Sequence, residues 1–287
     1  TGHNNYVYCA LINKYNTMGG PINQLISCSV DKTIRTWDID TGECTHKITS
    51  NQGIRSIAWW KQGQFLIEGG DGYPYEICIR QWNQHDYSKN ENHGTIVKTL
   101  QGHYGKVYML LVDEFKDQLI SCSSDESIRL WNLNTGKQLK QFKDHTGYVC
   151  AICKLNQSVI VSAGFDSCLK FWNIETGRCI DEINSAHKQC IWSLIYSASK
   201  QLLVSASADK TVKVWDVKMG EESKKIETCA LQFTMNNPFD EPCLSLAFTD
   251  DESRVLVGDK DGNMFIVDIN SGTCTNKFEN AHAAAIW

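Results

Sequence analysis

Short apolar stretches alternate with polar turns along the chain, with the period of strands rather than helices. In one representative segment the stretches 107–112, 118–123, 127–132 and 138–142 are rich in β-branched or aromatic residues. Asp, Asn, Gly and Ser bound these stretches, as expected at turns between short strands. The pattern therefore predicts four strands in this segment.

The same segment recurs roughly every 46 residues, which is the signature of a repeat architecture. Four copies align without gaps and end in a tryptophan followed by Asp or Asn: ISCSVDKTIRTWD, ISCSSDESIRLWN, IVSAGFDSCLKFWN and LVSASADKTVKVWD. A fifth copy, EICIRQWN, keeps only the second half and places Trp82 at the tryptophan position, while a sixth, LVGDKDGNMFIVD, has Val267 there. Six repeats are complete and a seventh begins at residue 281.

Each repeat also has a recognisable opening and a recognisable turn. A Gly-His, Asp-His or Ala-His pair stands four residues before an apolar residue at His3, His103, His145, His187 and His282. The tetrapeptides at 40–43, 134–137, 175–178 and 270–273 each carry glycine in third place, as a tight hairpin that needs a positive φ requires.

These features together resemble the WD-repeat (Trp-Asp) β-propeller family over nearly the whole chain. The resemblance implies an all-β fold, a β-propeller of four-stranded blades, with six complete blades plus the start of a seventh. A single domain over residues 1–287 is expected. Its blades should span about 3–50, 51–101, 102–143, 144–185, 186–228 and 229–280, with the seventh starting at 281–287.

The resemblance assigns a structural tetrad of His, Ser, Asp and Trp to four of the repeats. A neutral imidazole can donate to the turn carboxylate and accept from the hydroxyl, while the indole N–H donates inward. The tetrads are His3, Ser27, Asp31 and Trp37; His103, Ser121, Asp125 and Trp131; His145, Ser162, Asp166 and Trp172; and His187, Ser205, Asp209 and Trp215.

His, Asp and Ser are also the residues of a hydrolase triad. Catalysis needs one site, whereas four copies at a fixed spacing indicate scaffolding. The sequence therefore predicts no catalytic residues and no enzyme activity.

The second and sixth repeats depart from this pattern. The second has no histidine before Ile54, an enlarged turn at 69–75 and a polar connection at 83–94. The sixth lacks both histidine and tryptophan, and residues 229–242 precede it as an expected loop. Such loops can build specific contacts, or enzyme or sensor chemistry at 73–76 or 229–242, but sequence drift explains them equally well.

Other periodic residues favour plain structural roles. A basic residue stands two places before each tryptophan position, at Arg35, Arg80, Arg129, Lys170 and Lys213, and a solvated or edge-pairing role is favoured over a binding stripe. Cys150 and Cys153 have the spacing of half a zinc site, but no second pair follows. We expect no metal and no cofactor.

Composition narrows the partners and the compartment. The 287 residues have a net charge of −5, which offers no basic field for a nucleic-acid backbone. The longest apolar runs fall far short of the roughly 18 residues of a membrane span. The 13 cysteines are odd in number and suit reduced thiols. We expect protein partners, no nucleic acid, no membrane and a cytoplasmic location.

Residues that differ between repeats are the candidates for partner binding. Positions three and five after each histidine begin the innermost strand near one mouth of the family's channel, and residues before each turn aspartate rim the same face. Aromatic and cationic side chains there have the composition of an interaction hot spot. The candidates are Tyr6, Tyr8, Arg55, Lys106, Tyr108, Tyr148, Phe165, Trp192 and Trp287, although packing between blades would explain some of them.

The most direct interpretation is a non-catalytic protein–protein interaction scaffold that docks subunits or peptides within a larger assembly, with a cytoskeletal or ciliary complex as one expected home. The alternative is a substrate-recognition adaptor, for example of a ubiquitin ligase, that binds a peptide at the aromatic channel mouth.

Overall fold

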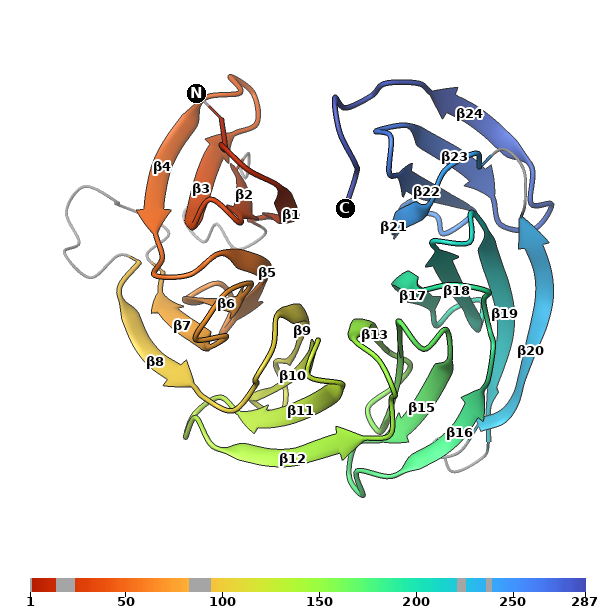
Figure 1. Cartoon of the computed structure of the whole chain (residues 1–287), viewed down its shortest axis with the longest axis horizontal. Coiled ribbons are helices and arrows are strands. Elements are labelled where there is room, and N and C mark those ends of the chain that lie inside the picture. The colour runs from red at the N-terminus through yellow and green to blue at the C-terminus, as the bar shows by residue number, and fades with distance from the viewer. Residues whose placement is uncertain (1, 14–23, 83–93, 221–225, 236–238) are drawn as a thin grey trace. The chain divides into compact units, whose positions relative to one another are not determined.

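The computed structural model describes residues 2–13, 24–82, 94–220, 226–235 and 239–287, which form strands and turns but no helix (Figure 1). The chain divides into two compact units, Thr1–Gln141 and Phe142–Trp287. Each unit holds three antiparallel four-stranded sheets. The predicted fold class, all-β with four-stranded propeller blades, is confirmed, while the single domain expected over 1–287 stays a prediction.

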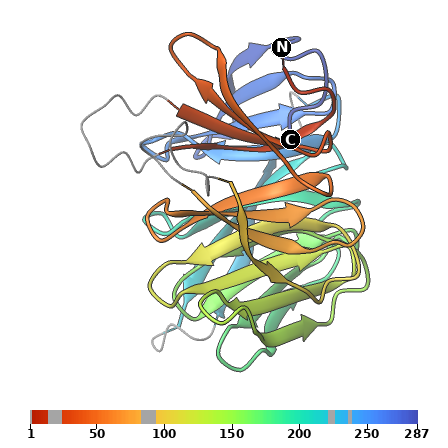
Figure 2. The same cartoon turned by 90° about the vertical axis from the view of Figure 1, so that its left-hand side faces the viewer.

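The first unit contains the first three blades, shown in red to yellow-green in Figures 1 and 2. Blade one consists of β1 (Val7–Ile12), β2 (Gln24–Ser29), β3 (Thr33–Asp38) and β4 (Cys44–Thr49). Blade two consists of β5 (Ile54–Trp60), β6 (Phe65–Gly70), β7 (Ile77–Gln81) and β8 (Ile96–Leu100). Blade three consists of β9 (Val107–Asp113), β10 (Gln118–Ser123), β11 (Ser127–Asn132) and β12 (Gln138–Lys143).

The second unit contains blades four to six. Blade four consists of β13 (Val149–Lys154), β14 (Val159–Gly164), β15 (Leu169–Asn173) and β16 (Cys179–Ile183). Blade five consists of β17 (Ile191–Ser197), β18 (Leu202–Ser207), β19 (Val212–Met219) and β20 (Ile226–Met235). Blade six consists of β21 (Cys243–Phe248), β22 (Arg254–Asp259), β23 (Met264–Asp268) and β24 (Cys274–Phe278).

Neighbouring blades within a unit meet along their first strands. In the first unit β5 contacts both β1 and β9, and in the second unit β17 contacts both β13 and β21. The fourth strand of each blade lies at the opposite edge of its sheet. Side chains at the beginning of the first strands therefore come close to side chains of the adjacent blade.

The hairpin between the third and fourth strands uses glycine as predicted. Gly136 has a φ of 75°, and its backbone N–H donates to the carbonyl of Asn132 at 2.8 Å. The side-chain oxygen of Asn132 accepts from the backbone N–H of Thr135 at 2.8 Å. Because L residues rarely adopt this left-handed φ, glycine allows the tight reversal at no steric cost.

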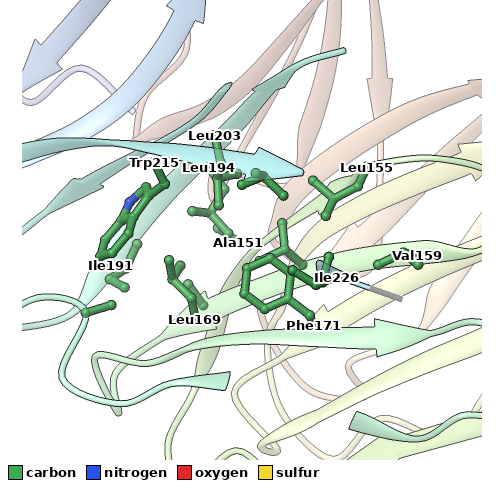
Figure 3. Packing of buried hydrophobic residues seen from close by; sticks show 14 residues of the cluster. Ala151, Leu155, Val159, Leu169, Phe171, Ile191, Leu194, Leu203, Trp215 and Ile226 are labelled. Atoms are coloured by element: carbon green, nitrogen blue, oxygen red, sulfur yellow. The ribbon is translucent and has the colours of Figure 1, made fainter. Parts of the chain in front are cut away.

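The core of each unit lies between facing sheets. Figure 3 shows the cluster that joins blades four and five, where Leu169 and Phe171 of β15 pack with Ile191 and Leu194 of β17 and with Leu203 of β18. Leu169, Phe171, Ile191 and Leu203 are fully buried. Burial of such side chains stabilises the fold by about 1.5–3 kcal/mol each, so blade-to-blade packing rather than isolated sheets holds each unit together.

Two expectations about the loops are wrong. Residues 229–242 were expected to form a loop before blade six, but β20 (Ile226–Met235) pairs along the whole of β19, so blade five extends beyond residue 228. Gly69 and Gly70 lie in β6, which leaves a shorter turn than 69–75. Most of the predicted connection at 83–94 lies outside the described residues.

Residues 281–287, expected to begin a seventh blade, contain no strand. They lie against blade six, where the backbone N–H of His282 donates to the carbonyl of Gly262 at 3.0 Å. The N–H of Ile286 likewise donates to the carbonyl of Asp259 at 3.0 Å, and Ser245 Oγ donates to the carbonyl of Ile286 at 3.0 Å.

Candidate functional site

The tetrad of blade three is a continuous series of buried hydrogen bonds. His103 Nδ1 lies 2.8 Å from Asp125 Oδ2, and His103 Nε2 lies 2.7 Å from Ser121 Oγ. Trp131 Nε1 donates to the same hydroxyl at 2.8 Å. Since an ionised carboxylate only accepts, Nδ1 carries the imidazole proton and Nε2 accepts from the serine. Each polar side-chain atom of the tetrad thereby has a partner.

The same geometry recurs in the other three predicted tetrads. The histidine-to-serine distances are 2.7 Å in blade one, 2.6 Å in blade four and 2.8 Å in blade five. The tryptophan-to-serine distances are 2.7, 2.7 and 2.9 Å in the same blades. Four copies of one network describe a scaffold rather than a single reaction centre. The residues are His3, Ser27, Asp31 and Trp37; His145, Ser162, Asp166 and Trp172; and His187, Ser205, Asp209 and Trp215.

The tetrad of blade three holds its histidine and aspartate in fixed protonation states. Burial lowers the pKa of His103 below its usual value, although the hydrogen bond to Asp125 opposes this shift. Burial would by itself raise the pKa of Asp125, but hydrogen bonds from His103, Ser127 and the backbone of Tyr104 hold it well below its usual range. A neutral imidazole beside an ionised carboxylate follows at neutral pH.

The tetrad aspartate also shapes the turn between the second and third strands. Asp125 Oδ1 accepts from the backbone N–H of Ser127 at 3.0 Å and from its hydroxyl at 2.6 Å. Glu126, between these residues, has a φ of 66°. The carboxylate hydrogen bonds thus stabilise a left-handed residue that is unfavourable by itself.

Blade two builds its network from different residues, which the strand pairing identifies. Gly70 pairs with the first residue of β5, as Ser123 pairs with the first residue of β9. Counting back two residues, Glu68 takes the place of Ser121. Ser50, four residues before β5, takes the place of His103.

The same pairing places Arg80 where a tetrad has its tryptophan. Leu66 pairs with Arg80 in blade two, as Leu119 pairs with Trp131 in blade three. The sequence alignment had put Trp82 at this position and had made Arg80 a solvated or edge-pairing residue, and both expectations are wrong. The longer turn between β6 and β7 shifts β7 by two residues, which preserves strand direction and face.

Glu68 and Arg80 form a buried, bidentate ion pair. Arg80 Nε donates to Glu68 Oε2 at 2.8 Å and Nη2 donates to Oε1 at 3.0 Å, with Arg80 4% and Glu68 0% exposed. Ser50 Oγ donates to Glu68 Oε1 at 2.8 Å, and Arg80 Nη1 donates to the carbonyl of Gly94 at 2.6 Å. The glutamate within the apolar stretch FLIEGG was the sequence signal for this site.

Three predicted partner residues of the first unit stack on one another. The Arg55 guanidinium carbon lies 4.0 Å from the Tyr8 ring centre and 4.1 Å from the Tyr108 ring centre. These residues come from β5, β1 and β9, so the stack joins all three blades of the unit. Arg55 is only 7% exposed and donates to Asp71 at 3.3 Å. We therefore assign Arg55 to packing between blades, which corrects its placement among the partner-binding residues.

Two further candidates of the first unit border this stack. Tyr6 is 56% exposed and its ring stacks on Tyr8 at a centre-to-centre distance of 6.0 Å. Lys106 Nζ lies 3.3 Å from Asp71 Oδ1, with about half of its side chain exposed. Tyr6 and Lys106 are the candidates of this unit with the largest access to solvent.

The four candidates of the second unit form a continuous row of aromatic rings. Tyr148 lies 4.9 Å from Phe165, Phe165 lies 5.4 Å from Trp192, and Trp192 lies 5.2 Å from Trp287, between ring centres. The last two contacts are edge-to-face, the arrangement that aromatic pairs favour. Tyr148 is 45% and Phe165 is 46% exposed, so the row is a surface feature.

The match to known proteins follows the tetrads. The family model for the WD domain, G-beta repeat, matches residues 1–38, 94–132, 136–173 and 177–216, which together make up more than half of the chain. The chain belongs to the WD-repeat family. The family is typically non-catalytic, and membership indicates a protein-interaction scaffold.

Individual WD-repeat relatives match shorter stretches. WD repeat-containing protein 18 of Mus musculus is 29% identical over 126 residues, covering 42% of this chain and 28% of the relative. A subunit of chromatin assembly factor 1 from Mus musculus is 25% identical over 150 residues, covering 45% of this chain and 26% of the relative. WD repeat-containing protein pop2 of Schizosaccharomyces pombe is 28% identical over 148 residues, covering 43% of this chain and 21% of the relative. The alignments thus span about a quarter of the relatives' length.

One acidic cluster of this WD-repeat chain has the spacing of a metal site. Asp144, Cys179 and Glu182 offer ligand atoms within 4.8 Å of one another. Lys170 Nζ already lies 2.5 Å from Asp144 Oδ2 and 2.7 Å from Glu182 Oε2. The lysine ammonium therefore offsets part of the charge of this cluster. Lys170 is buried rather than solvated, and its bond to Glu182 on the edge strand β16 agrees with the edge-pairing alternative.

The described residues contain no helix that is long and apolar enough to cross a membrane.

Proposed function

We propose that this WD-repeat chain is a scaffold that docks protein partners through the aromatic row Tyr148, Phe165, Trp192 and Trp287. The observation that carries the proposal is the exposure of Tyr148 and Phe165, at 45% and 46%, on a row whose other rings support them. Exposed aromatic side chains on a rigid base are enriched among the residues that dominate binding energy.

The base of the row is rigid because three of its four rings lie on the tetrad blades four and five. Tyr148 precedes β13, and its carbonyl accepts from the backbone N–H of Phe165 at 2.9 Å. Phe165 in turn precedes Asp166, the tetrad aspartate of blade four. Little conformational entropy remains to be lost when a partner binds such a preorganised surface.

We propose a peptide segment with an apolar or aromatic anchor as the occupant. The two exposed rings offer a compact apolar area that one or two such side chains could cover. Tyr6 and Lys106 of the first unit are a separate candidate contact surface, supported by their exposure beside the Tyr8–Arg55–Tyr108 stack.

The relatives support membership of a larger assembly. The matched chromatin assembly factor 1 protein is by its name one subunit of a multiprotein factor. We extend to this chain only the general role of an assembly component. A cytoplasmic home, with a cytoskeletal or ciliary complex as the assembly, remains our proposal and is supported by the 13 free cysteines, which suit a reducing compartment.

Affinity purification from an extract of the source cells tests the proposal. The bait is the full chain, compared with Tyr148→Ala/Phe165→Ala and with the matched control Leu231→Ala/Phe278→Ala. The control pair is similarly exposed, at 46% and 43%, but lies on the fourth strands β20 and β24. We expect the recovered amount of the specific partners to fall at least about tenfold with the first variant, since each hot-spot truncation weakens binding by about 2 kcal/mol or more.

Equal recovery with both variants would overturn docking at the aromatic row.

A second candidate function, a substrate-recognition adaptor such as that of a ubiquitin ligase, is favoured by the small area of the exposed ring pair. An adaptor predicts that clients are lost from Tyr148→Ala/Phe165→Ala while ligase subunits remain bound.

A further inference from the structure

Two cysteines of blade one face each other across neighbouring strands. Cys9 of β1 pairs with Cys28 of β2 in the antiparallel register. Residues that are directly opposite in such a sheet point to the same face, with Cα atoms about 4.5–5.5 Å apart. A disulfide requires Cα atoms about 4.4–6.8 Å apart, so the backbone already provides the spacing.

The environment of the two thiols differs. The neighbouring Cys28 side chain lowers the pKa of the Cys9 thiol even though burial opposes the shift. Burial raises the pKa of Cys28 well above its usual value. Cys28 is fully buried, whereas Cys9 is partly exposed. The pair therefore consists of a more acidic thiol and a protonated neighbour, both packed against the core of blade one.

We propose that Cys9 and Cys28 form a peroxide-reactive dithiol that closes to a disulfide within blade one. The Cys9 thiolate attacks one oxygen of hydrogen peroxide, the O–O bond breaks, and Cys9 becomes a sulfenic acid while hydroxide leaves. The Cys28 sulfur then attacks the sulfenic sulfur, the S–O bond breaks, and the S–S bond forms.

The reaction balances without another reagent. Two thiols lose two protons and two electrons, and hydrogen peroxide takes them up to give two molecules of water. The proton released when the Cys9 thiol ionises and the Cys28 proton end on the two departing oxygens. Reduction by a dithiol reverses the bond.

The arrangement distinguishes blade one from the other blades at the same pair of positions. Cys122 of blade three occupies the place of Cys28 but faces Met109. In blades four and five the equivalent pairs are Ala163 with Ala151 and Ala206 with Ser193. Cys122 is therefore an internal control with the same burial and no thiol opposite it.

Peptide mapping of the full reduced chain after peroxide treatment tests the proposal. Remaining thiols are alkylated under denaturing conditions before digestion. We expect a cross-linked peptide that joins Cys9 to Cys28 and disappears on reduction, while Cys122 is recovered alkylated. Cys28→Ser should leave Cys9 as a sulfenic acid that a cyclic diketone labels, and Cys9→Ser should leave Cys28 unoxidised.

Two results would overturn the assignment. One is full alkylation of Cys9 and Cys28 at a peroxide concentration that oxidises a partly exposed cysteine such as Cys44. The other is a Cys9 disulfide to a cysteine other than Cys28. The wild-type map decides the point even if a variant folds poorly, and its outcome does not depend on docking at the aromatic row.

Discussion

Blades two and three of the first unit solve the same packing problem with different chemistry. Blade three joins its strands through His103, Ser121 and Trp131, whereas blade two uses Ser50, Glu68 and Arg80 at the equivalent places. Both networks are buried, and each hub side chain on the second strand bonds to both neighbours. Each blade requires that the buried polar groups at this position all have hydrogen-bond partners, and different residues can meet that requirement.

The two hydrogen-bonded networks differ in the electrostatic penalty for burying them. Burying a neutral hydroxyl between hydrogen-bonding partners carries a small free-energy penalty. Burying a carboxylate is tolerated only when a cation and further hydrogen-bond donors compensate its lost hydration. Glu68 receives two hydrogen bonds from Arg80 and one from Ser50. Removing one partner should therefore harm blade two more than a comparable change harms blade three.

The largest effect should come from Arg80→Met, which leaves Glu68 buried without its cation. We expect the free energy of unfolding to fall by about 3–5 kcal/mol. Denaturant unfolding of the full chain measures it. The double variant Glu68→Leu/Arg80→Met removes both charges and should recover most of the loss. A single variant that unfolds like the wild type would contradict the buried ion pair.

In blade three, Ser121→Ala should cost about 1–3 kcal/mol, because it leaves the buried N–H of Trp131 and the ring nitrogen of His103 without their shared partner. The same unfolding measurement applies. Ser121→Thr, which keeps the hydroxyl, is the control for lost hydrogen bonding. Equal stabilities of the Ala and Thr variants would show that the hydroxyl is not the hub.

Ser50→Ala should have a smaller effect, about 0.5–1.5 kcal/mol, since Glu68 keeps both hydrogen bonds from Arg80. Denaturant unfolding again measures the difference from the wild type. If Ser50→Ala proved as damaging as Arg80→Met, serine rather than arginine would be the main partner of the carboxylate.

The smallest effect on stability should come from a change in pH near neutrality. This effect should be larger in blade three than in blade two. The pKa of His103 in the folded state lies below its ordinary value of 6.5 because of burial, so the unfolded chain binds the proton first as pH falls. The stabilisation is complete above about pH 6.5 and is lost as pH decreases below it. Asp125, whose pKa is lowered from 3.8, adds a loss only at more acidic pH.

Hydrogen exchange at about pH 7 and about pH 5.5 checks this difference. Amides of β10 and β11 should lose protection at the lower pH, whereas those of β6 and β7, joined by Ser50, Glu68 and Arg80, should change less. Uniform loss of protection in both blades would show that the histidine does not set the acid response.

Much of the fold could be predicted from the sequence because one physical unit recurs. Alternating apolar positions and glycine turns, as at Gly136, predicted the strands, and the resemblance to the WD-repeat family supplied the tetrads. The register of β7 could not be predicted, because alignment matched Trp82 to Trp131 by identity while strand pairing matched Arg80 to it. The extent of β20 was missed for a related reason, since its sequence departs from the repeat.

The candidate surface was predictable only as a set of positions. Variable residues at the beginning of the first strands and before the turn aspartates did include the row from Tyr148 to Trp287. Composition alone could not distinguish Arg55 from Lys106, because a guanidinium that stacks between two tyrosines is buried whereas a nearby ammonium stays exposed. Only the placement of neighbouring rings separates these outcomes.

The network of Ser50, Glu68 and Arg80, which replaces the tetrad in blade two, also affects how repeats are counted. The family model recognises four segments in this chain, but hydrogen-bonded strands form six sheets in its described part. Counting the histidine and tryptophan motifs therefore gives a lower bound on the number of blades. Related chains that have lost these motifs in some repeats can contain more blades than a motif search finds.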